Sequence, residues 1–554
     1  MDDCLFDSGF VALIGVLRPL KESDLAHATG NECGNFRVIA APPFSRRFVV
    51  VLMVALCTAI VGQIARTAFV PDPVQPMLTP NGWYRLESSA GRGFCRLPSG
   101  SGSYMLVIGC LADASEAHEV RIKFTRDDDL AGQLRDVEQT VRLLSFSDEA
   151  TGESPLLRTL PLTVECFDRI AAASAMDDAA SNRAVALGDT RDFFIHVTDG
   201  ELNDPKQYAR MTAQCVGEGS RVRIFVDQQL GTNGIRDSQV RDLIHLLEAD
   251  VLPRVEAQFG TLVDVDHDGR FAIVISPWLS RLQGGRVSIN GMVRNTDFRR
   301  DVAPPLGNQC DMLLLNSALP SSAALRDLLS HEIAHAACIS QRVRFQPTRL
   351  GDEQDWVSEG LAHLAEPTDT NSGERIATFL DKPSQHPLVI PDYYRAGLWR
   401  DPGCRGATVL FFKWCAERQG YEFCRRLAQS SEAGCRSIEQ ATKERFEDLF
   451  RQWSVSLVDE NGSQPDGKQG GGRVVQPTKL CRQNPIVGDA DVALTIRGTA
   501  FTVVELPSNN AASVILRIEG DSAAHWQYSI RRNTSKTPTL ESNTRLLAAD
   551  RGSR

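Results

Sequence analysis

Residues 321–340 read SSAALRDLLSHEIAHAACIS. The apolar residues of this stretch recur at intervals of three and four, which predicts one amphipathic helix: Leu325, Leu328, Leu329, Ile333, Ala336 and Ala337. Positions four apart lie on one helix face, so His331 and His335 can direct their ring nitrogens at one ion. Glu332 lies one position further round, where it can reach a water molecule beside that ion without being a ligand itself. The motif alone is equally compatible with a solvated, charged helix face.

A third candidate ligand follows in DWVSEGLAHLAE at 355–366. Glu359 lies 24 residues after His335 (359 − 335), near the start of a second predicted helix that Asp355 can cap. A catalytic zinc needs three protein ligands and one open position. Two histidines on one helix and a glutamate on the next complete such a set. The alternative is a surface carboxylate, and the preceding tryptophan and the EGLA context argue against it.

HEIAH followed by WVSEGLAHLAE resembles the gluzincin metallopeptidases, and most closely the hyicolysin-type peptidase family. The stretches VDVDHDGRFAIVIS at 263–276 and GATVLFFKWC onward at 406–453 extend the similarity, which covers about 190–458. The resemblance implies a zincin-like α+β domain that hydrolyses peptide bonds. It also implies one Zn²⁺ per chain on His331, His335 and Glu359, with Glu332 as the general base.

The sequence departs from the family pattern at two positions. Related sequences tend to have a tyrosine before the Gly-Ala that opens a later helix, and Arg405 stands there instead. The residue that stabilises the transition state is therefore open, and the other candidates are Tyr393, Tyr394 and His363. His363 occupies the position of the thermolysin-like carboxylate four residues after the third ligand. Another residue must then orient the histidines, and Glu366 is on the same helix face.

Segment 284–295, GGRVSINGMVRN, precedes the HEIAH helix and has the alternation of an edge strand that a peptide can extend. Its only charges are Arg286 and Arg294, where gluzincin aminopeptidases have an acid that holds the substrate amine. This favours an endopeptidase, although Glu366 or Glu353 could supply an acid from elsewhere. The alternatives are an aminopeptidase or a catalytically inactive cell-surface binding protein on a peptidase fold. Glu332 argues against the catalytically inactive alternative, because a structural metal site needs no base.

Asp264, Asp266, Asp268 and Gly269 form a DxDxDG turn that resembles the start of a calcium loop. An EF-hand would need glutamate at the twelfth position, where Ile275 stands. The alternative is a tight Asp/Gly turn that leads into a buried strand. A Ca²⁺ site and a plain turn both remain open.

The 554-residue chain is 42% hydrophobic and 23% charged, as is usual for folded proteins, and its length suggests several domains. Its net charge of −10 and the lack of a basic stripe argue against nucleic acid as a partner, which leaves peptide or protein substrates.

Periodicity predicts helices over 237–259, 322–339, 355–366, 406–418, 420–428 and 443–458. The predicted division is a tail (1–47), an apolar segment (48–65), a linker (66–82), a β-rich domain (83–190), the α+β peptidase domain (191–458), a second linker (459–476) and a C-terminal β-rich domain (477–554).

Residues 48–64 carry no charge over 17 positions, with Arg46 and Arg47 before them and Arg66 after them. This pattern predicts a transmembrane signal-anchor within 48–65 that leaves the bulk of the chain outside the cytoplasm. A cleaved secretion signal and a buried core helix are the alternatives. The 14 cysteines form no CxxC pair, and in an extracytoplasmic protein some of them could be paired. The suggestive cluster is Cys404, Cys415, Cys424 and Cys435.

Overall fold

The structure is a computed structural model, and its described residues combine helices and sheets, which confirms the α+β class at this coarse level. The predicted tail, the apolar segment 48–65 and most of both linkers lie outside the described residues. Within the described part, no helix is both long and apolar enough to cross a membrane. The described residues are 82–86, 88–89, 91–99, 103–114, 116–126, 143–145, 185–231, 234–319, 322–345, 352–367, 372–398, 400–420, 422–460, 480, 491–507 and 513–533.

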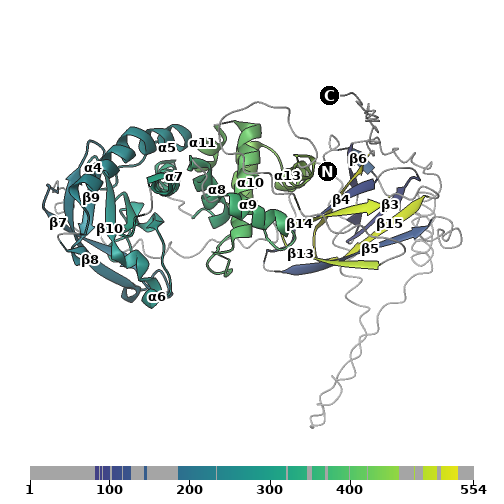
Figure 1. The fold of residues 1–554 in the computed structure, drawn as a ribbon, viewed down its shortest axis with the longest axis horizontal. Coiled ribbons are helices and arrows are strands. Elements are labelled where there is room, and N and C mark those ends of the chain that lie inside the picture. The colour runs from purple at the N-terminus through teal and green to yellow at the C-terminus, as the bar shows by residue number, and fades with distance from the viewer. Residues whose placement is uncertain are drawn as a thin grey trace, which may run out of the picture. The chain divides into compact units, whose positions relative to one another are not determined.

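A six-stranded mixed sheet forms the first half of the predicted peptidase region, in the order β11-β12-β10-β9-β8-β7 (Figure 1). The three central strands are parallel and buried on both faces, as their continuous apolar runs predict. The edge strand β11 runs antiparallel to β12. The bounds are β7 (Thr190–His196), β8 (Tyr208–Glu218), β9 (Val222–Asp227), β10 (Phe271–Ser276), β11 (Gly291–Met292) and β12 (Met312–Asn316).

Helices cover one face of this sheet. The predicted helix over 237–259 is α4 (Asp237–Leu246), a π-helical turn η6 (Leu247–Val251) and α5 (Leu252–Phe259). It packs with α7 (Ser322–Phe345), the HEIAH helix, into one core with the inward side chains of β9, β10 and β12. The opposite face is covered by the loop after β10, through Leu279 and Leu282. Short turns complete this half: η4 (Pro205–Gln207), η5 (Gln228–Leu230), η7 (Pro277–Ser280), α6 (Leu282–Gly285) and η8 (Asn295–Phe298).

The second half of the region is helical: α8 (Asp355–Ala365), α9 (Ser372–Asp381), α10 (Pro402–Gln419), α11 (Glu422–Ala428), α12 (Cys435–Thr442) and α13 (Phe446–Glu460). Four of these match predicted ranges within a few residues, whereas α9 and α12 were not predicted. Helices α8 and α10 pack closely because Gly360 has no side chain: a Cβ there would lie 2.2 Å from the Phe412 ring. This approach holds the start of α10 beside Glu359 on α8.

The two predicted β-rich regions form one sandwich rather than two domains, which corrects the expected division. Its sheets have the orders β14-β4-β16-β1-β6 and β13-β5-β15-β3-β2, so strands from both regions alternate. A strand's periodicity does not predict its partner, because hydrogen-bond pairing is non-local. The first region supplies β1 (Trp83–Leu86), β2 (Ser88–Ser89), β3 (Arg92–Leu97), β4 (Ser103–Cys110), β5 (Ala117–Arg126) and β6 (Leu143–Ser145). The second region supplies β13 (Asp491–Arg497), β14 (Phe501–Pro507), β15 (Val514–Gly520) and β16 (Trp526–Asn533).

The cysteines of the described residues are free thiols, most of them buried. The suggested pairing among Cys404, Cys415, Cys424 and Cys435 is therefore wrong in this structure. All four lie on helices that pack in the core of the helical half.

Candidate metal centre

The two histidines of HEIAH point their Nε2 atoms at one place. These atoms lie 3.2 Å apart, on successive turns of α7. Each Nδ1 atom has its own partner: His331 donates to Glu366 Oε1 at 2.8 Å, and His335 lies 2.9 Å from Ser358 Oγ. Because Nδ1 of each ring is engaged by its own partner, Nε2 is the nitrogen through which each ring would bind a metal.

Glu359 brings a carboxylate to the same place from α8. Its Oε2 atom lies 3.3 Å from His331 Nε2, and its Oε1 atom lies 4.0 Å from His335 Nε2. Two ligand atoms at about 2.1 Å from a tetrahedral zinc are about 3.4 Å apart. The two histidines and Glu359 therefore fit zinc in donor type and in spacing.

His363 also lies near these groups, and it forms a possible metal-holding set with His331 and Glu359. Its Nδ1 atom, however, is 2.7 Å from Glu366 Oε1, and its Nε2 atom is 3.2 Å from the Arg375 guanidinium. A cation beside Nε2 disfavours a metal there. We therefore keep His335 as the third member of the set.

Glu332 lies beside the histidines and against the edge strand. Its side chain is 7% exposed, and a Cβ at Gly291 of β11 would lie 2.8 Å from it. Burial raises the pKa of Glu332 to about 7, and the neighbouring Glu359 and Glu366 add to the rise, against the opposing effect of His331 and Arg405. A carboxylate with such a pKa can both accept and return a proton near neutral pH.

Arg405 reaches the centre from the first turn of α10. Its guanidinium contacts Glu359 Oε2 and lies over the Tyr393 ring at 4.5 Å from the ring centre. Burial alone would raise the pKa of Glu359, but Arg405 and His331 hold it well below its usual value. The same surroundings raise the pKa of Arg405 in spite of its burial, so this residue remains a cation.

The other candidates from the sequence have different places. The Tyr393 hydroxyl is buried and lies 3.0 Å from Thr408 Oγ1, so this residue supports Arg405 through its ring. Tyr394 is 51% exposed, and its hydroxyl accepts from Gln283 Nε2 at 2.6 Å. Glu366, the suggested orienting residue, accepts from both His331 and His363.

In the metal-free centre the two histidines differ in protonation. Burial would lower the pKa of His331, but Glu359 and Glu366 outweigh this effect and raise it to about 10. Burial and the neighbouring His331 lower the pKa of His335 to about 3. At neutral pH the metal-free His331 is therefore an imidazolium with a proton on each ring nitrogen, between the Glu359 and Glu366 carboxylates.

Sequence reasoning missed Ser358 and Arg375. Ser358 precedes Glu359 directly, and its partner His335 is 23 residues away in the chain. The feature that could have identified Ser358 is its position on the predicted helix that carries Glu359. Arg375 lies on α9, which was not predicted, and nothing in its local sequence marks it.

The two arginines of segment 284–295 do not act as expected. Arg294 is largely buried, and it donates to Asp297 at 3.0 Å and to the Phe194 carbonyl at 3.0 Å. Arg286 is exposed and pairs with Asp199 at 3.2 Å. These contacts involve no residue of the candidate metal centre. The two arginines therefore give no evidence that the site repels a substrate ammonium group.

The Asp-rich turn differs in part from a calcium loop. Asp268 pairs with Arg223, and Asp266 pairs with Arg191 at 2.7 Å. The carboxylates that come together are Asp264, Asp266 and Asp311, the last from the residue before β12. Asp311 takes the place expected for Asp268, and Ca²⁺ at this turn stays a prediction.

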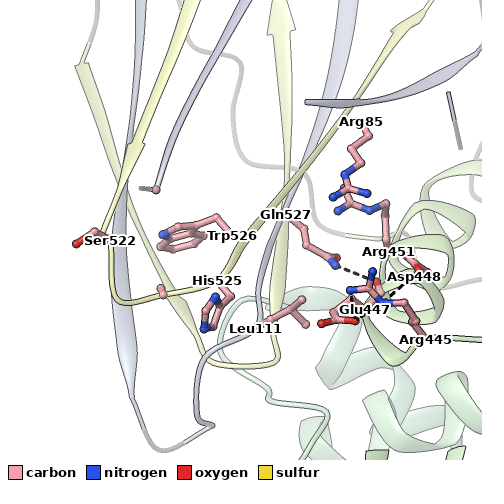
Figure 2. A pocket seen from close by; sticks show the side chains of 12 residues that line it. Arg85, Leu111, Arg445, Glu447, Asp448, Arg451, Ser522, His525, Trp526 and Gln527 are labelled. Carbon is pink, nitrogen blue, oxygen red and sulfur yellow. Dashed lines mark hydrogen bonds and ion pairs between the residues drawn. The ribbon is translucent and has the colours of Figure 1, made fainter. Parts of the chain in front are cut away.

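A separate pocket lies where β1 and β16 meet the start of α13 (Figure 2). Charged side chains line it, among them Arg85, Arg445 and Glu447. None of its lining residues belongs to the metal centre. Its position therefore gives no support to a role in catalysis.

Comparison with protein-family models gave no match, and no curated protein matched the sequence significantly.

Proposed function

We propose that this protein is a zinc-dependent peptidase of the gluzincin type, with a zincin-like domain over about 190–458 and a likeness to the hyicolysin-type family. The observation that carries the proposal is the convergence of His331 Nε2, His335 Nε2 and the Glu359 carboxylate, with Glu332 beside them. Most structural zinc sites have four protein ligands, and none needs a base. Three ligands with an adjacent buried carboxylate favour catalysis over a binding role.

Zinc, when bound, would acidify the attacking water and polarise the scissile carbonyl. Glu332 takes a proton from the water as its oxygen attacks the carbonyl carbon, and then gives this proton to the amine nitrogen as the C–N bond breaks. Its raised pKa suits both steps. Glu366 and Ser358 hold the imidazoles of His331 and His335 in the orientation that a metal requires.

Arg405 is our candidate for the group that stabilises the transition state. It is the cation that contacts a proposed ligand directly, and the Tyr393 ring supports its guanidinium. A permanent cation cannot give up a proton at neutral pH. Its role would therefore be electrostatic: to offset the negative charge that develops on the carbonyl oxygen.

The substrate would bind as an added strand along β11, the sheet edge beside Glu332. An aminopeptidase would need a carboxylate for the substrate ammonium group. The two acids that the sequence offered are both engaged: Glu366 with His331 and His363, and Glu353 with Arg342. This supports internal cleavage of protein chains over the removal of N-terminal residues.

We also keep the proposal that residues 48–65 anchor the protein in a membrane with the catalytic domain outside the cytoplasm, secretion being the alternative. The basis is the uncharged run after Arg46 and Arg47. Membrane fractionation and protection from external protease test this placement. A fully soluble, cytosolic full-length product would contradict it.

The test of the proposed function is Glu332→Gln in the full chain. The amide keeps the shape of the side chain but cannot accept the proton, so we expect wild-type zinc content and a loss of cleavage of an unfolded protein substrate by a factor of at least about 10². Glu422→Gln on α11, 68% exposed, is the matched control and should retain full activity. Undiminished cleavage by Glu332→Gln would remove Glu332 as the base. A zinc-loaded wild type that cleaves nothing would favour the inactive binding protein.

A further inference from the structure

A second group of possible metal ligands lies at the start of α10 and includes none of the residues of the metal centre. It consists of His386, Asp401 and Cys404, each of which offers one ligand atom within 4.8 Å of the others. Cys404 is fully buried, while the side chains of His386 and Asp401 are 11% and 26% exposed. The group is thus closed on the cysteine side and open to solvent on the other.

The His386 ring is held in place yet lacks a hydrogen bond at its buried nitrogen. Nδ1 lies 3.0 Å from Asp401 Oδ1, at ion-pair distance but outside hydrogen-bond geometry, and His386 helps to lower the pKa of the Asp401 carboxyl. The ring packs against Gly403, where a Cβ would lie 2.3 Å from it. An imidazole nitrogen and a carboxylate oxygen at this separation have the spacing of two ligands of one ion.

We propose that His386, Asp401 and Cys404 bind a second zinc ion, separate from the one at His331, His335 and Glu359. Nitrogen, oxygen and thiolate sulfur together are the donors of zinc and similar ions, whereas calcium and magnesium take oxygen alone. A thiolate and a carboxylate would balance the charge of a divalent ion. Ligand atoms on one tetrahedral zinc are about 3.3–3.8 Å apart, so small side-chain rotations close the set.

Zinc at this site would have to displace a proton from Cys404. Burial raises the pKa of the Cys404 thiol well above its ordinary value, the Asp401 carboxylate adds to the rise, and the nearby Arg497 and Arg405 oppose it. Zinc binding therefore releases the thiol proton to solvent, and His386 must carry its proton on Nε2. The remaining position, on the exposed side, is open to water.

The site would fix the first turn of α10. Asp401 is the N-cap of this helix and already accepts from the Cys404 amide at 2.9 Å. Arg405 follows Cys404 directly and reaches Glu359. An ion at this site would thus hold in place the residue that contacts the first metal centre.

Cobalt(II) tests the site in the full-length chain, because thiolate–cobalt bonds give a near-ultraviolet charge-transfer band and the first centre contains no sulfur. We expect two cobalt ions per metal-free chain, with the band present. Cys404→Ser should remove the band and lower the stoichiometry from two to one. Cys415→Ser, another buried cysteine on α10, is the matched control and should keep both.

A second variant tests the site even if Cys404→Ser fails to fold. His386→Gln keeps the thiol, and we expect cobalt to bind at least about tenfold more weakly at the band-forming site. Glu359→Ala should keep the band at full strength, because it alters only the first centre. Absence of the band in the wild type, or its survival in Cys404→Ser, would overturn the inference. The charge-transfer band reports metal binding and not cleavage. The second site can therefore be confirmed or refuted even if the protein proves not to be a peptidase.

Discussion

Arg405 places a positive charge directly beside the proposed ligand Glu359. The Arg405 guanidinium contacts Glu359 and lies over the Tyr393 ring. A tyrosine can donate a hydrogen bond, whereas an arginine adds a full positive charge. The charge also lowers the pKa of the Glu359 carboxyl, which keeps this proposed ligand ionised.

Replacement of Arg405 should lower kcat far more than it raises KM, because the residue acts on charge that develops in the transition state. We expect Arg405→Gln to lose about 10²–10³-fold in kcat, with zinc content unchanged. Arg405→Tyr should recover part of this loss by donating a hydrogen bond. Steady-state kinetics on one peptide decide the matter. An unchanged kcat, or an effect confined to KM, would show that Arg405 only binds substrate.

The proton on His331 predicts how zinc affinity varies with pH. The pKa of His331 in the metal-free site is raised from 6.5 to about 10, so zinc must displace a proton throughout the neutral range. Apparent affinity should rise about tenfold per pH unit from about 7 to 9. The raised pKa stabilises the metal-free fold below pH 6.5, and this stabilisation is lost as pH rises through 10. Calorimetric titration of zinc at several pH values checks this, and an affinity that does not change with pH would contradict it.

Among single residues, the sequence predicted those whose role follows from spacing along one helix. His331, His335 and Glu332 follow from one helix, and Glu359 from the next. The orientation of His331 by Glu366 was suggested from a shared helix face, but the contact of Arg375 with His363 was not, because it depends on how α9 packs. Tyr394 was a candidate by residue type alone, and its contact with Gln283 joins two loops 111 positions apart.

Among the elements, the strands of the sandwich depend on each other across the length of the chain. β4 pairs with β14 on one side and β16 on the other, and β5 pairs with β13 and β15. All four partners come from residues 491–533. Without them β4 and β5 would have no partner strand among the described residues, and their backbone groups would be unpaired.

Deletion of residues 480–554 should therefore unfold the whole sandwich and not just remove a domain. We expect an insoluble product, or rapid proteolysis of 83–126 while the wild type resists. Co-expression of the 480–554 fragment should restore part of the protection by supplying the missing strands. A soluble truncated chain with residues 83–126 still protected would show that this region folds alone, as the sequence suggested.

The elements that the sequence predicted well are those with strong periodicity, such as α7, α10 and the central strands β9, β10 and β12. It missed the short helices α9 and α12, and it missed β8 although the side chains of that strand alternate between buried and less buried positions. The pairing of two distant β regions could not be predicted, because a strand's own pattern shows which face is buried but not which strand lies beside it.

At the scale of the whole molecule, the proposed metal centre takes its residues from two halves of one domain. The sheet half supplies α7 and the edge strand β11 against Glu332, and the helical half supplies Glu359 and Arg405. The close approach of Gly360 to Phe412 keeps the residues of the helical half together. Activity should therefore require both halves, and a bound metal should link the sheet half to the helical half through its ligands.

The central claim is that a metal at His331, His335 and Glu359 cleaves peptide bonds within a chain. The most direct test is to titrate zinc into the chelator-treated full-length protein while following cleavage of a peptide with an acetylated N-terminus. We predict no cleavage without metal, a rise to a plateau as zinc is added, and no rise in Glu359→Ala. Cleavage that persists without metal, or a zinc-loaded protein that cleaves only a peptide with a free N-terminus, would contradict the account.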